Sequence, residues 1–289
     1  MSRFRQFLNI PKLVSIGVAS AGVIAGASFQ AQCYSRNQPE DSPMFVPKYA
    51  QWDRNWDKRE PETLVRRSRK VSRTEKIDFT PEQINKKTAK ATRHVILIRH
   101  GQYNLDGSSD KENYLTSLGE DQAMGTGKRL KELGIKFDSI TSSDMTRARQ
   151  TADLIFRTLG QDHLCSVNLD PMLQEGAPAL PDPPLSYDQW DPNFYEFYTE
   201  GPRIEAAFRK YIHRANPEQE KDSHEIIVCH ANVIRYFFCR ALQFPGQAWL
   251  RMNLTHASLT VLSILPTGHV VVSSLGDAGH LPINCCTVT

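Results

Sequence analysis

The sequence contains no pair of cysteines at CxxC spacing. Structural zinc sites and small disulfide frameworks are built on paired cysteines at short, regular spacing, so we expect neither here. Cys229 falls within a predicted strand and Cys239 within a predicted helix, which indicates buried, reduced thiols. The six cysteines lie at positions 33, 165, 229, 239, 285 and 286.

Acidic residues are absent before Glu40, and basic residues outnumber acidic ones by 18 to 9 in residues 1–94. The formal net charge of the whole chain is +3, but residues 1–94 carry +9 and residues 95–289 carry −6. The basic excess therefore lies in the N-terminal segment and not over the remaining two thirds. A basic arm can bind nucleic acid or anionic lipid. Because no nucleic-acid-binding motif accompanies it, we expect a membrane partner and no nucleic acid.

No charged residue interrupts the stretch from Leu13 to Tyr34, which basic residues flank on both sides. About 20 apolar residues can cross a bilayer as a helix, although this stretch is rich in glycine, alanine and serine. It is interpreted as a membrane anchor, which we favour, as a removed organellar targeting segment, or as a cleaved secretory signal. We expect residues 1–12 to form a basic flank and residues 13–35 a single transmembrane or mitochondrial targeting segment.

Residues 36–93 are polar and contain several prolines, so we expect a linker in front of a domain at 94–289. The linker contains one anomaly, the sequence WDRNWD at 52–57, which holds two of the four tryptophans of the chain. A separation of four residues puts both rings on one face of a helix or a strand. Such anchors are typical of subunit interfaces, but packing on this chain's own domain or on a membrane surface has equal weight.

Predicted strands alternate with predicted helices from residue 94 onward. The apolar runs at 95–98 and 226–229 are short and β-branched, which indicates buried parallel strands. This alternation predicts a parallel α/β sheet, to which the last two strands add an antiparallel edge. Further strands are expected at 137–141, 258–265 and 269–275, helices at about 117–133, 145–159, 203–214 and 232–242, and a long proline-rich functional loop at 171–201.

Histidines follow two of the predicted strands directly. The tripeptide Arg99-His100-Gly101 comes after the first strand, and His230 follows the strand at 226–229. Ligands of open α/β sheets bind beyond the carboxyl ends of the strands. Two histidines at that edge, one of them beside an arginine, predict chemistry on an anionic group.

These residues resemble a known family in their order and spacing. The RHG tripeptide at 99–101, Arg147 at the start of a helix, Glu175 in the sequence LQEG and the late His230 resemble the histidine phosphatase, or phosphoglycerate mutase-like, superfamily over residues 94–280. The resemblance implies a phosphoglycerate mutase-like three-layer α/β/α fold, with the N-terminal membrane helix and the linker in front of it.

The same residues suit the chemistry of a phosphomonoester. Arg99 and Arg147 can hold the terminal oxygens through planar guanidinium contacts, and His230 can donate a further hydrogen bond. His100 is the expected nucleophile and would form a phosphohistidine, its other nitrogen donating to a backbone carbonyl. Glu175 is the expected general acid and then base, with a pKa raised by apolar surroundings. We expect no metal and no other cofactor, since the arginines supply the positive charge.

The residues after His100 depart from the mutase pattern. Mutases of the superfamily continue with Glu-Ser and carry an asparagine six positions after the histidine. Here Gln102 and Tyr103 follow, and the sixth position is Asp106. The departure favours a phosphatase with little or no mutase activity.

The sequences at 52–57, 175–178, 204–208 and 230–236 narrow the resemblance to a mitochondrial serine/threonine phosphatase branch of the superfamily. This implies a membrane-anchored, metal-independent enzyme, on the outer or less favourably the inner mitochondrial membrane. Its phosphoprotein substrates would include an apoptosis signal-regulating MAP kinase kinase kinase in stress and cell-death signalling. The alternatives are a small-molecule phosphomonoesterase and a membrane-tethered scaffold. The resemblance also implies homo-oligomers, dimers and higher assemblies, held by Trp52, Asp53, Asn55, Trp56 and Asp57.

Overall fold

The computed structural model describes residues 51–69, 78–164, 166–184 and 194–288. The predicted anchor at 13–35 lies outside these residues. Within the described part of the chain, no helix combines the length and the apolar character that a bilayer crossing needs.

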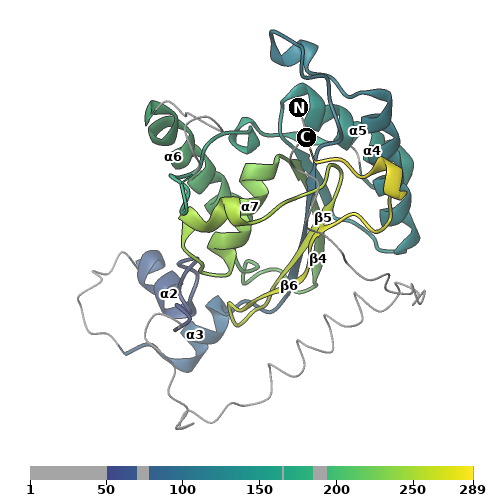
Figure 1. Cartoon of the computed structure of the whole chain (residues 1–289). Coiled ribbons are helices and arrows are strands. Elements are labelled where there is room, and N and C mark those ends of the chain that lie inside the picture. The colour runs from purple at the N-terminus through teal and green to yellow at the C-terminus, as the bar shows by residue number, and fades with distance from the viewer. Residues whose placement is uncertain (1–50, 70–77, 165, 185–193, 289) are drawn as a thin grey trace, which may run out of the picture.

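A six-stranded mixed sheet forms the centre of the domain (Figure 1). The strands stand in the order β3-β2-β4-β1-β5-β6. The pairs β1–β4, β2–β4 and β2–β3 are parallel, whereas β1–β5 and β5–β6 are antiparallel. The predicted parallel sheet with an antiparallel edge is therefore confirmed. The bounds are Arg93–Arg99 for β1, Ser139–Ser142 for β2, Asn168–Leu169 for β3, Ser223–Cys229 for β4, Leu259–Ile264 for β5 and Val270–Asp277 for β6.

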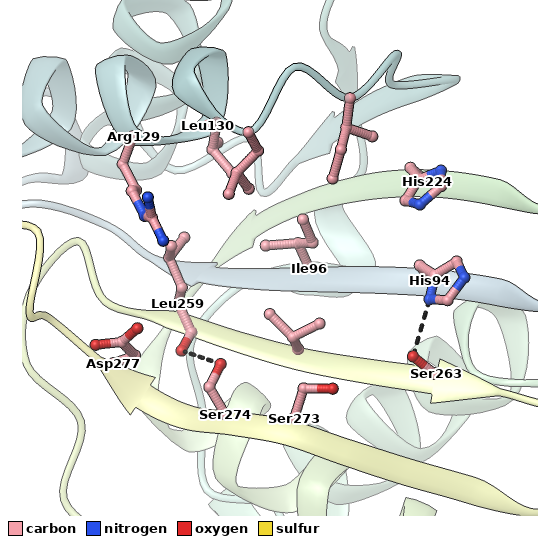
Figure 2. A pocket seen from close by; sticks show the side chains of 13 residues that line it. His94, Ile96, Arg129, Leu130, His224, Leu259, Ser263, Ser273, Ser274 and Asp277 are labelled. Atoms are coloured by element: carbon pink, nitrogen blue, oxygen red, sulfur yellow. Dashed lines mark hydrogen bonds between the residues drawn. The ribbon is translucent and has the colours of Figure 1, made fainter. Parts of the chain in front are cut away.

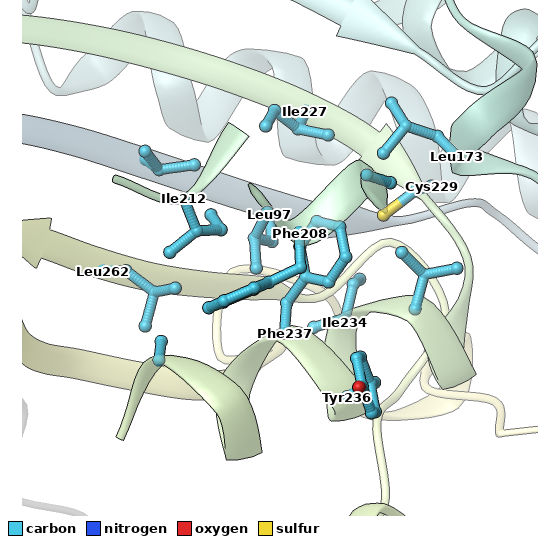
Figure 3. Close-up of a cluster of buried hydrophobic side chains, with 14 of the residues drawn as sticks. Leu97, Leu173, Phe208, Ile212, Ile227, Cys229, Ile234, Tyr236, Phe237 and Leu262 are labelled. Atoms are coloured by element: carbon cyan, nitrogen blue, oxygen red, sulfur yellow. The ribbon is translucent and has the colours of Figure 1, made fainter. Parts of the chain in front are cut away.

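Helices cover both faces of this sheet (Figure 1). Alternate residues of β1 point to opposite faces, so that Ile96 and Ile98 join one apolar cluster and Val95 and Leu97 the other. Figure 3 shows the second cluster, with Leu97 among its members. Burial of each such side chain contributes about 1.5–3 kcal/mol. The result is the three-layer α/β/α arrangement that the family resemblance implied. The covering helices are α4 (Ser117–Glu132) and α5 (Thr146–Leu159) on one face, and α6 (Phe194–Tyr211) and α7 (Ala231–Ala241) on the other.

Local sequence signals set several helix ends. The Thr116 hydroxyl caps α4 by accepting a hydrogen bond from Gly119 N at 3.1 Å. Helix α5 ends at Gly160, whose φ of 58° is the left-handed conformation that glycine adopts without strain. In the N-terminal segment, Thr80 is the N-cap of a short helix whose first residue is Pro81.

The loop prediction for residues 171–201 is wrong from Phe194 onward, because α6 begins there. Pro202 lies inside this helix, and a proline inside a helical pattern reads as a break because it lacks the N–H of the helix ladder. The two-residue strand β3 was also not predicted. It precedes a 3-10 turn, η3 (Pro171–Leu173), that leads toward Glu175.

The segment predicted as a linker contains two helices, α2 (Pro61–Arg69) and α3 (Pro81–Lys87). In front of them the WDRNWD motif packs on the chain's own domain. The Trp56 indole N–H donates to Gly268 O at 2.7 Å, in the turn between β5 and β6, and the Trp56 ring lies 5.9 Å from that of Phe208. Asp57 Oδ1 lies 2.6 Å from Arg214 Nη2, and both side chains are buried. Contact of the motif with another subunit stays a prediction.

A small pocket of about 60 Å³ lies between the sheet and α4 (Figure 2). Its walls are mostly apolar, with the stacked rings of His94 and His224 at one end and Arg129 and Asp277 at the other. None of the predicted catalytic residues lines this pocket. The candidate chemistry lies elsewhere, at the carboxyl ends of β1 and β4.

Candidate active site

The parallel pairing of β1 and β4 brings the two strand-end histidines together. Arg99 pairs with Cys229 at the ends of these strands, and the next residues are His100 and His230. The backbone N–H of His100 donates to Cys229 O at 3.0 Å, and the two imidazole centres are 5.0 Å apart. The prediction of a histidine pair at this edge is confirmed.

The His100 ring is held in one tautomer. Its Nδ1 lies 2.8 Å from Gly101 O, and because a carbonyl can only accept, Nδ1 carries the proton and Nε2 keeps its lone pair. Burial, with the charges of His230, Arg147 and Arg99, lowers the pKa of His100 well below its ordinary value. The ring is therefore neutral at neutral pH. The predicted hydrogen bond to a backbone carbonyl is observed.

Two backbone carbonyls hold the Arg99 side chain, one in front of β5 and one in the C-terminal segment. Its Nη1 donates to Leu254 O at 2.6 Å and to Val288 O at 2.8 Å. Burial lowers the pKa of Arg99 to about 10, while the charge of Glu175 opposes the shift. The guanidinium therefore keeps its positive charge at neutral pH, inside a largely dry site.

Arg147 occupies the first turn of α5 and is buried. Its Nε donates to the free Nε2 of His100 at 3.2 Å, and its guanidinium carbon lies 4.6 Å from the centre of the Tyr103 ring. Asp110 anchors this turn, because its Oδ2 accepts from Thr146 N and Oγ1 at 3.0 and 2.9 Å. Its other oxygen lies 3.7 Å from Arg147 Nη1. Sequence reasoning missed Asp110, which lies in a loop without periodic pattern.

Glu175 reaches the same edge through β3 and the 3-10 turn η3. Its backbone is clamped by Arg203 of α6, which donates to the carbonyls of Met172, Gln174 and Glu175 at 2.9, 2.7 and 2.9 Å. Glu200 forms a close ion pair with Arg203. Burial raises the pKa of Glu175, while Gly176 N and the nearby arginines oppose the shift. The direction is the one predicted for a general acid.

His230 is fully buried and lies against Ser143, in the short connection between β2 and α5. Its Nε2 is 2.9 Å from Ser143 Oγ, and burial, reinforced by the charge of Arg147, lowers its pKa well below the ordinary value. His230 is thus a neutral ring beside the nucleophile. Its hydrogen bond to a phosphoryl oxygen stays a prediction.

Two further residues of the site were not predicted as site residues. Arg235 of α7 donates to Asn232 Oδ1 at 3.0 Å and interacts electrostatically with Glu175. Its position five residues after His230, in a helix that starts at the sheet edge, is the signal that could have identified it. His256 lies in front of β5, with its ring centre 5.6 Å from that of His100. An antiparallel strand starts at the edge where its parallel neighbours end, so the predicted antiparallel edge is the signal that could have identified His256.

The arrangement suits a phosphate dianion. Arg99, Arg147 and Arg235 lie around the neutral ring of His100 and the carboxyl group of Glu175, whose raised pKa favours its protonated form. Of the eight buried side-chain N or O atoms without a hydrogen-bond partner among the described residues, four belong to this site. Buried polar groups are normally paired, so this concentration indicates a polar ligand. The four belong to Arg99, His230, Arg235 and His256.

The predicted residues separate into two places. The structure brings Arg99, His100, Arg147, Glu175 and His230 to one edge of the sheet. The WDRNWD motif contacts the turn at Gly268, and Ile264 before that turn pairs with Arg93 at the start of β1. The motif therefore lies at the other end of the strands, where β1 begins. Within the described residues, no group of three histidine, cysteine or acidic side chains could hold a metal ion.

Comparison with known proteins yields consistent matches. The family model of the histidine phosphatase superfamily (branch 1) matches residues 95–275. The human protein named serine/threonine-protein phosphatase PGAM5, mitochondrial, is 47% identical over 290 residues, covering 96% of this chain and 97% of its own. The Drosophila melanogaster protein of that name is 48% identical over 256 residues, covering 89% and 87%. A solved phosphoglycerate mutase from Plasmodium falciparum is 33% identical, covers 67% of this chain and 96% of its own, and has a TM-score of 0.46.

Proposed function

Because the chain belongs to the histidine phosphatase superfamily, we propose that it hydrolyses phosphoserine and phosphothreonine esters of proteins without a metal ion. The observation that carries the proposal is the neutral His100, whose Nδ1 is tied to Gly101 O while Nε2 meets Arg147. A histidine held in this tautomer between arginines keeps a lone pair on Nε2 that can attack phosphorus. The names of the human and fly relatives support a phosphoprotein as the substrate.

The first step transfers the phosphoryl group to the enzyme. The lone pair on His100 Nε2 attacks phosphorus, and the bond from phosphorus to the serine or threonine oxygen breaks. Glu175 donates its proton to that leaving oxygen. Arg147 turns its N–H groups from His100 to the phosphoryl oxygens, and Arg99 and His230 complete the set of donors.

The second step releases phosphate. Glu175, now ionised, takes a proton from a water molecule, whose oxygen attacks phosphorus as the bond to Nε2 breaks. Inorganic phosphate leaves, and His100 and Glu175 return to their starting states. Splitting the reaction helps, because uncatalysed hydrolysis of phosphate monoesters is among the slowest known reactions.

The experiment measures phosphate release from a phosphothreonine peptide in the presence of EDTA. We expect activity to persist in the chelator and to be lost in His100→Ala. Acid-labile phosphate should be trapped on His100 in the wild-type enzyme. Activity that survives in His100→Ala would refute this mechanism. A higher kcat/KM for 3-phosphoglycerate than for the peptide would favour a small-molecule phosphomonoesterase. If no isomer of 3-phosphoglycerate forms in that assay, mutase activity is excluded.

The proposal extends to the site of action. Residues 13–35 would hold the enzyme on a mitochondrial membrane, in a single pass and with the outer membrane favoured. The relatives' names give mitochondria as their location, and the uncharged stretch lies between basic flanks. An apoptosis signal-regulating MAP kinase kinase kinase is the proposed substrate in stress and cell-death signalling. Protease protection of tagged mitochondria tests the membrane and the orientation.

Homo-oligomers, dimers and higher assemblies, would form through Trp52, Asp53, Asn55, Trp56 and Asp57. The supporting observation is Trp52, whose ring lies 6.1 Å from that of His269 while its indole N–H is buried without a partner among the described residues. Light scattering of the Trp52→Ala/Trp56→Ala variant should show a smaller mass than the wild type. An unchanged mass would show that the WDRNWD motif packs on its own chain and does not hold subunits together.

A further inference from the structure

His256 stands next to the nucleophile but comes from the antiparallel side of the sheet. It precedes β5, is 1% exposed, and its ring centre lies 5.6 Å from that of His100. Its Nε2 is buried and has no hydrogen-bond partner among the described residues. The positive charges of Arg99 and Arg147 act on this ring, which places it within the phosphate-binding set.

A chain of hydrogen bonds connects His256 to the C-terminal segment. The N–H of Gln102 donates to Gln122 Oε1 at 2.8 Å, which fixes the orientation of the Gln122 amide. Gln122 Nε2 then donates to Cys285 O at 2.7 Å and to Thr287 Oγ1 at 2.9 Å. Thr287 Oγ1 in turn lies 2.9 Å from His256 Nδ1. The last bond can run in either direction from geometry alone.

The donors and acceptors of Thr287 decide that direction. A threonine hydroxyl has one hydrogen to donate, and Thr287 Oγ1 already accepts from Gln122. Within the described residues, His256 Nδ1 is the acceptor that its hydrogen can reach. Donation to Nδ1 gives the hydroxyl hydrogen of Thr287 an acceptor, and it leaves the proton of His256 on Nε2. The unpaired atom is therefore a donor.

The backbone beside His256 supports a functional position. Ala257 has a φ of 56°, a left-handed conformation that costs a residue with a side chain about 1 kcal/mol or more. Its N–H lies 3.0 Å from Arg99 O and 3.2 Å from His100 O, and its carbonyl accepts from Thr126. The strained residue thus ties the turn that carries His256 to the backbone of the nucleophile. Strain of this kind is concentrated at functional sites.

We propose that His256 is a further catalytic residue, which offers a neutral Nε2–H to an oxygen of the transferred phosphoryl group, and that Thr287 is a positioning residue that fixes this tautomer. The inference rests on the proposed phosphatase function and names a donor beyond Arg99, Arg147 and His230. It also gives the C-terminal segment a part in catalysis.

The test compares variants of the full chain with orthovanadate, inorganic phosphate and p-nitrophenyl phosphate as probes. His256→Phe keeps a ring and removes the donor. Thr287→Val keeps the shape of the side chain and removes the hydroxyl, whereas Thr287→Ser is the matched control that keeps it. A hydrogen bond to a charged group corresponds to about 10- to 100-fold in affinity, so His256→Phe should weaken vanadate inhibition and lower kcat/KM by that factor. Thr287→Val should change both in the same direction, and Thr287→Ser should not.

Two readouts separate this role from mere support of the fold. The nitrogen chemical shifts of His256 should show a proton on Nε2 in the wild type and in Thr287→Ser, and a shift toward Nδ1 in Thr287→Val. The double variant should be no worse than His256→Phe alone, since both changes remove one donor. Unchanged vanadate inhibition in His256→Phe at an unchanged melting temperature would overturn the inference. Equal losses in Thr287→Val and Thr287→Ser would overturn the role of Thr287, even if His256→Phe fails to fold.

Failure of the proposed function has a different signature. A wild-type chain that hydrolyses no phosphomonoester and binds no vanadate would refute the phosphatase itself. An active wild type with an indifferent His256 would refute only the additional donor.

Discussion

Arg147 donates its Nε hydrogen to the lone pair of His100 Nε2, at 3.2 Å. In the proposed mechanism, one side chain therefore covers the attacking atom and also supplies positive charge for the phosphoryl group. We expect the oxygens of an entering phosphate dianion to compete for the same guanidinium, so that His100 Nε2 is uncovered as the substrate binds. This contact makes several consequences measurable.

Arg147→Lys should lower kcat/KM for a phosphothreonine peptide by about 10- to 100-fold. Lysine keeps the charge but not the planar pair of donors that binds two phosphoryl oxygens. Steady-state kinetics measure the effect, and Arg149→Lys, an exposed position on the same helix, is the control. Equal values for both variants would show that charge alone matters at Arg147.

Glu175→Gln should lower kcat for the phosphothreonine peptide by about 10²- to 10⁴-fold, since the variant has no proton to give the leaving oxygen. The loss should be smaller for p-nitrophenyl phosphate, whose leaving group needs less protonation. In the wild type, burial raises the pKa of Glu175, so the acid form persists above the usual range and kcat falls as pH rises through the raised pKa. A pH profile of the variant that keeps this alkaline limb would assign the limb to another group.

Acid should destabilise the protein through its buried histidines. The pKa of His256 is lowered to about 3 by burial next to Arg99, whereas the unfolded chain has a value of about 6.5. Below pH 6.5 the unfolded state binds more protons, so stability is full above that pH and is lost as pH falls toward 3. The slope is at most about 1.4 kcal/mol per pH unit for each such group. Urea unfolding between pH 7 and 4 should give a shallower slope for His256→Gln than for the wild type.

Arg203→Met should lower kcat by about 10- to 100-fold and leave KM little changed. Its guanidinium holds the carbonyls of Met172, Gln174 and Glu175, and a misplacement of about 1 Å can cost 10²-fold in rate. Arg209→Met, at an exposed position of the same helix, is the matched control. A drop in melting temperature with an unchanged kcat would make Arg203 a stabilising residue only.

Asp57→Asn should destabilise the chain by about 3–5 kcal/mol, because Arg214 would remain buried without its counter-charge. The side chains of Asp57 and Arg214 are 0% and 4% exposed, respectively. Asp53→Asn in the same motif changes an exposed carboxylate, 58% accessible, and should be nearly neutral. Denaturant unfolding measures both. Similar effects of the two substitutions would show that the Asp57–Arg214 pair does not hold the motif to the domain.

The strands that deliver the chemistry were predictable because their sequences have one physical explanation. Short β-branched runs such as 95–98 are typical of central strands that are buried on both faces, and the edge where parallel strands end is fixed by topology. That argument identified Arg99, His100 and His230. Arg147 and Glu175 were identified by the family's order of motifs, because an arginine in a helix or a glutamate in a loop has many other uses.

The residues that sequence reasoning missed act across long separations. Arg203 serves Glu175 from a helix that the sequence pattern placed too late, since Pro202 reads as a break. His256 reaches the site because β5 runs against β1; the antiparallel edge was predicted, but the approach of the residues in front of β5 to the site was not. Asp110 lies in an irregular loop. Each of these roles depends on pairing between distant segments, which local periodicity does not contain.

The direction of β5 has a consequence for how such a chain can evolve. His256 stands at the beginning of β5, and the turn that receives Trp56 follows its end. Inserting one residue within β5 would turn every following side chain to the other face and would displace one end against the other. An insertion in the loop at 101–115 turns no strand, although it must leave Asp110 within reach of Thr146. A change in chain length within β5 therefore acts on both ends of the sheet at once, whereas one in the loop at 101–115 acts only at the end that carries His100.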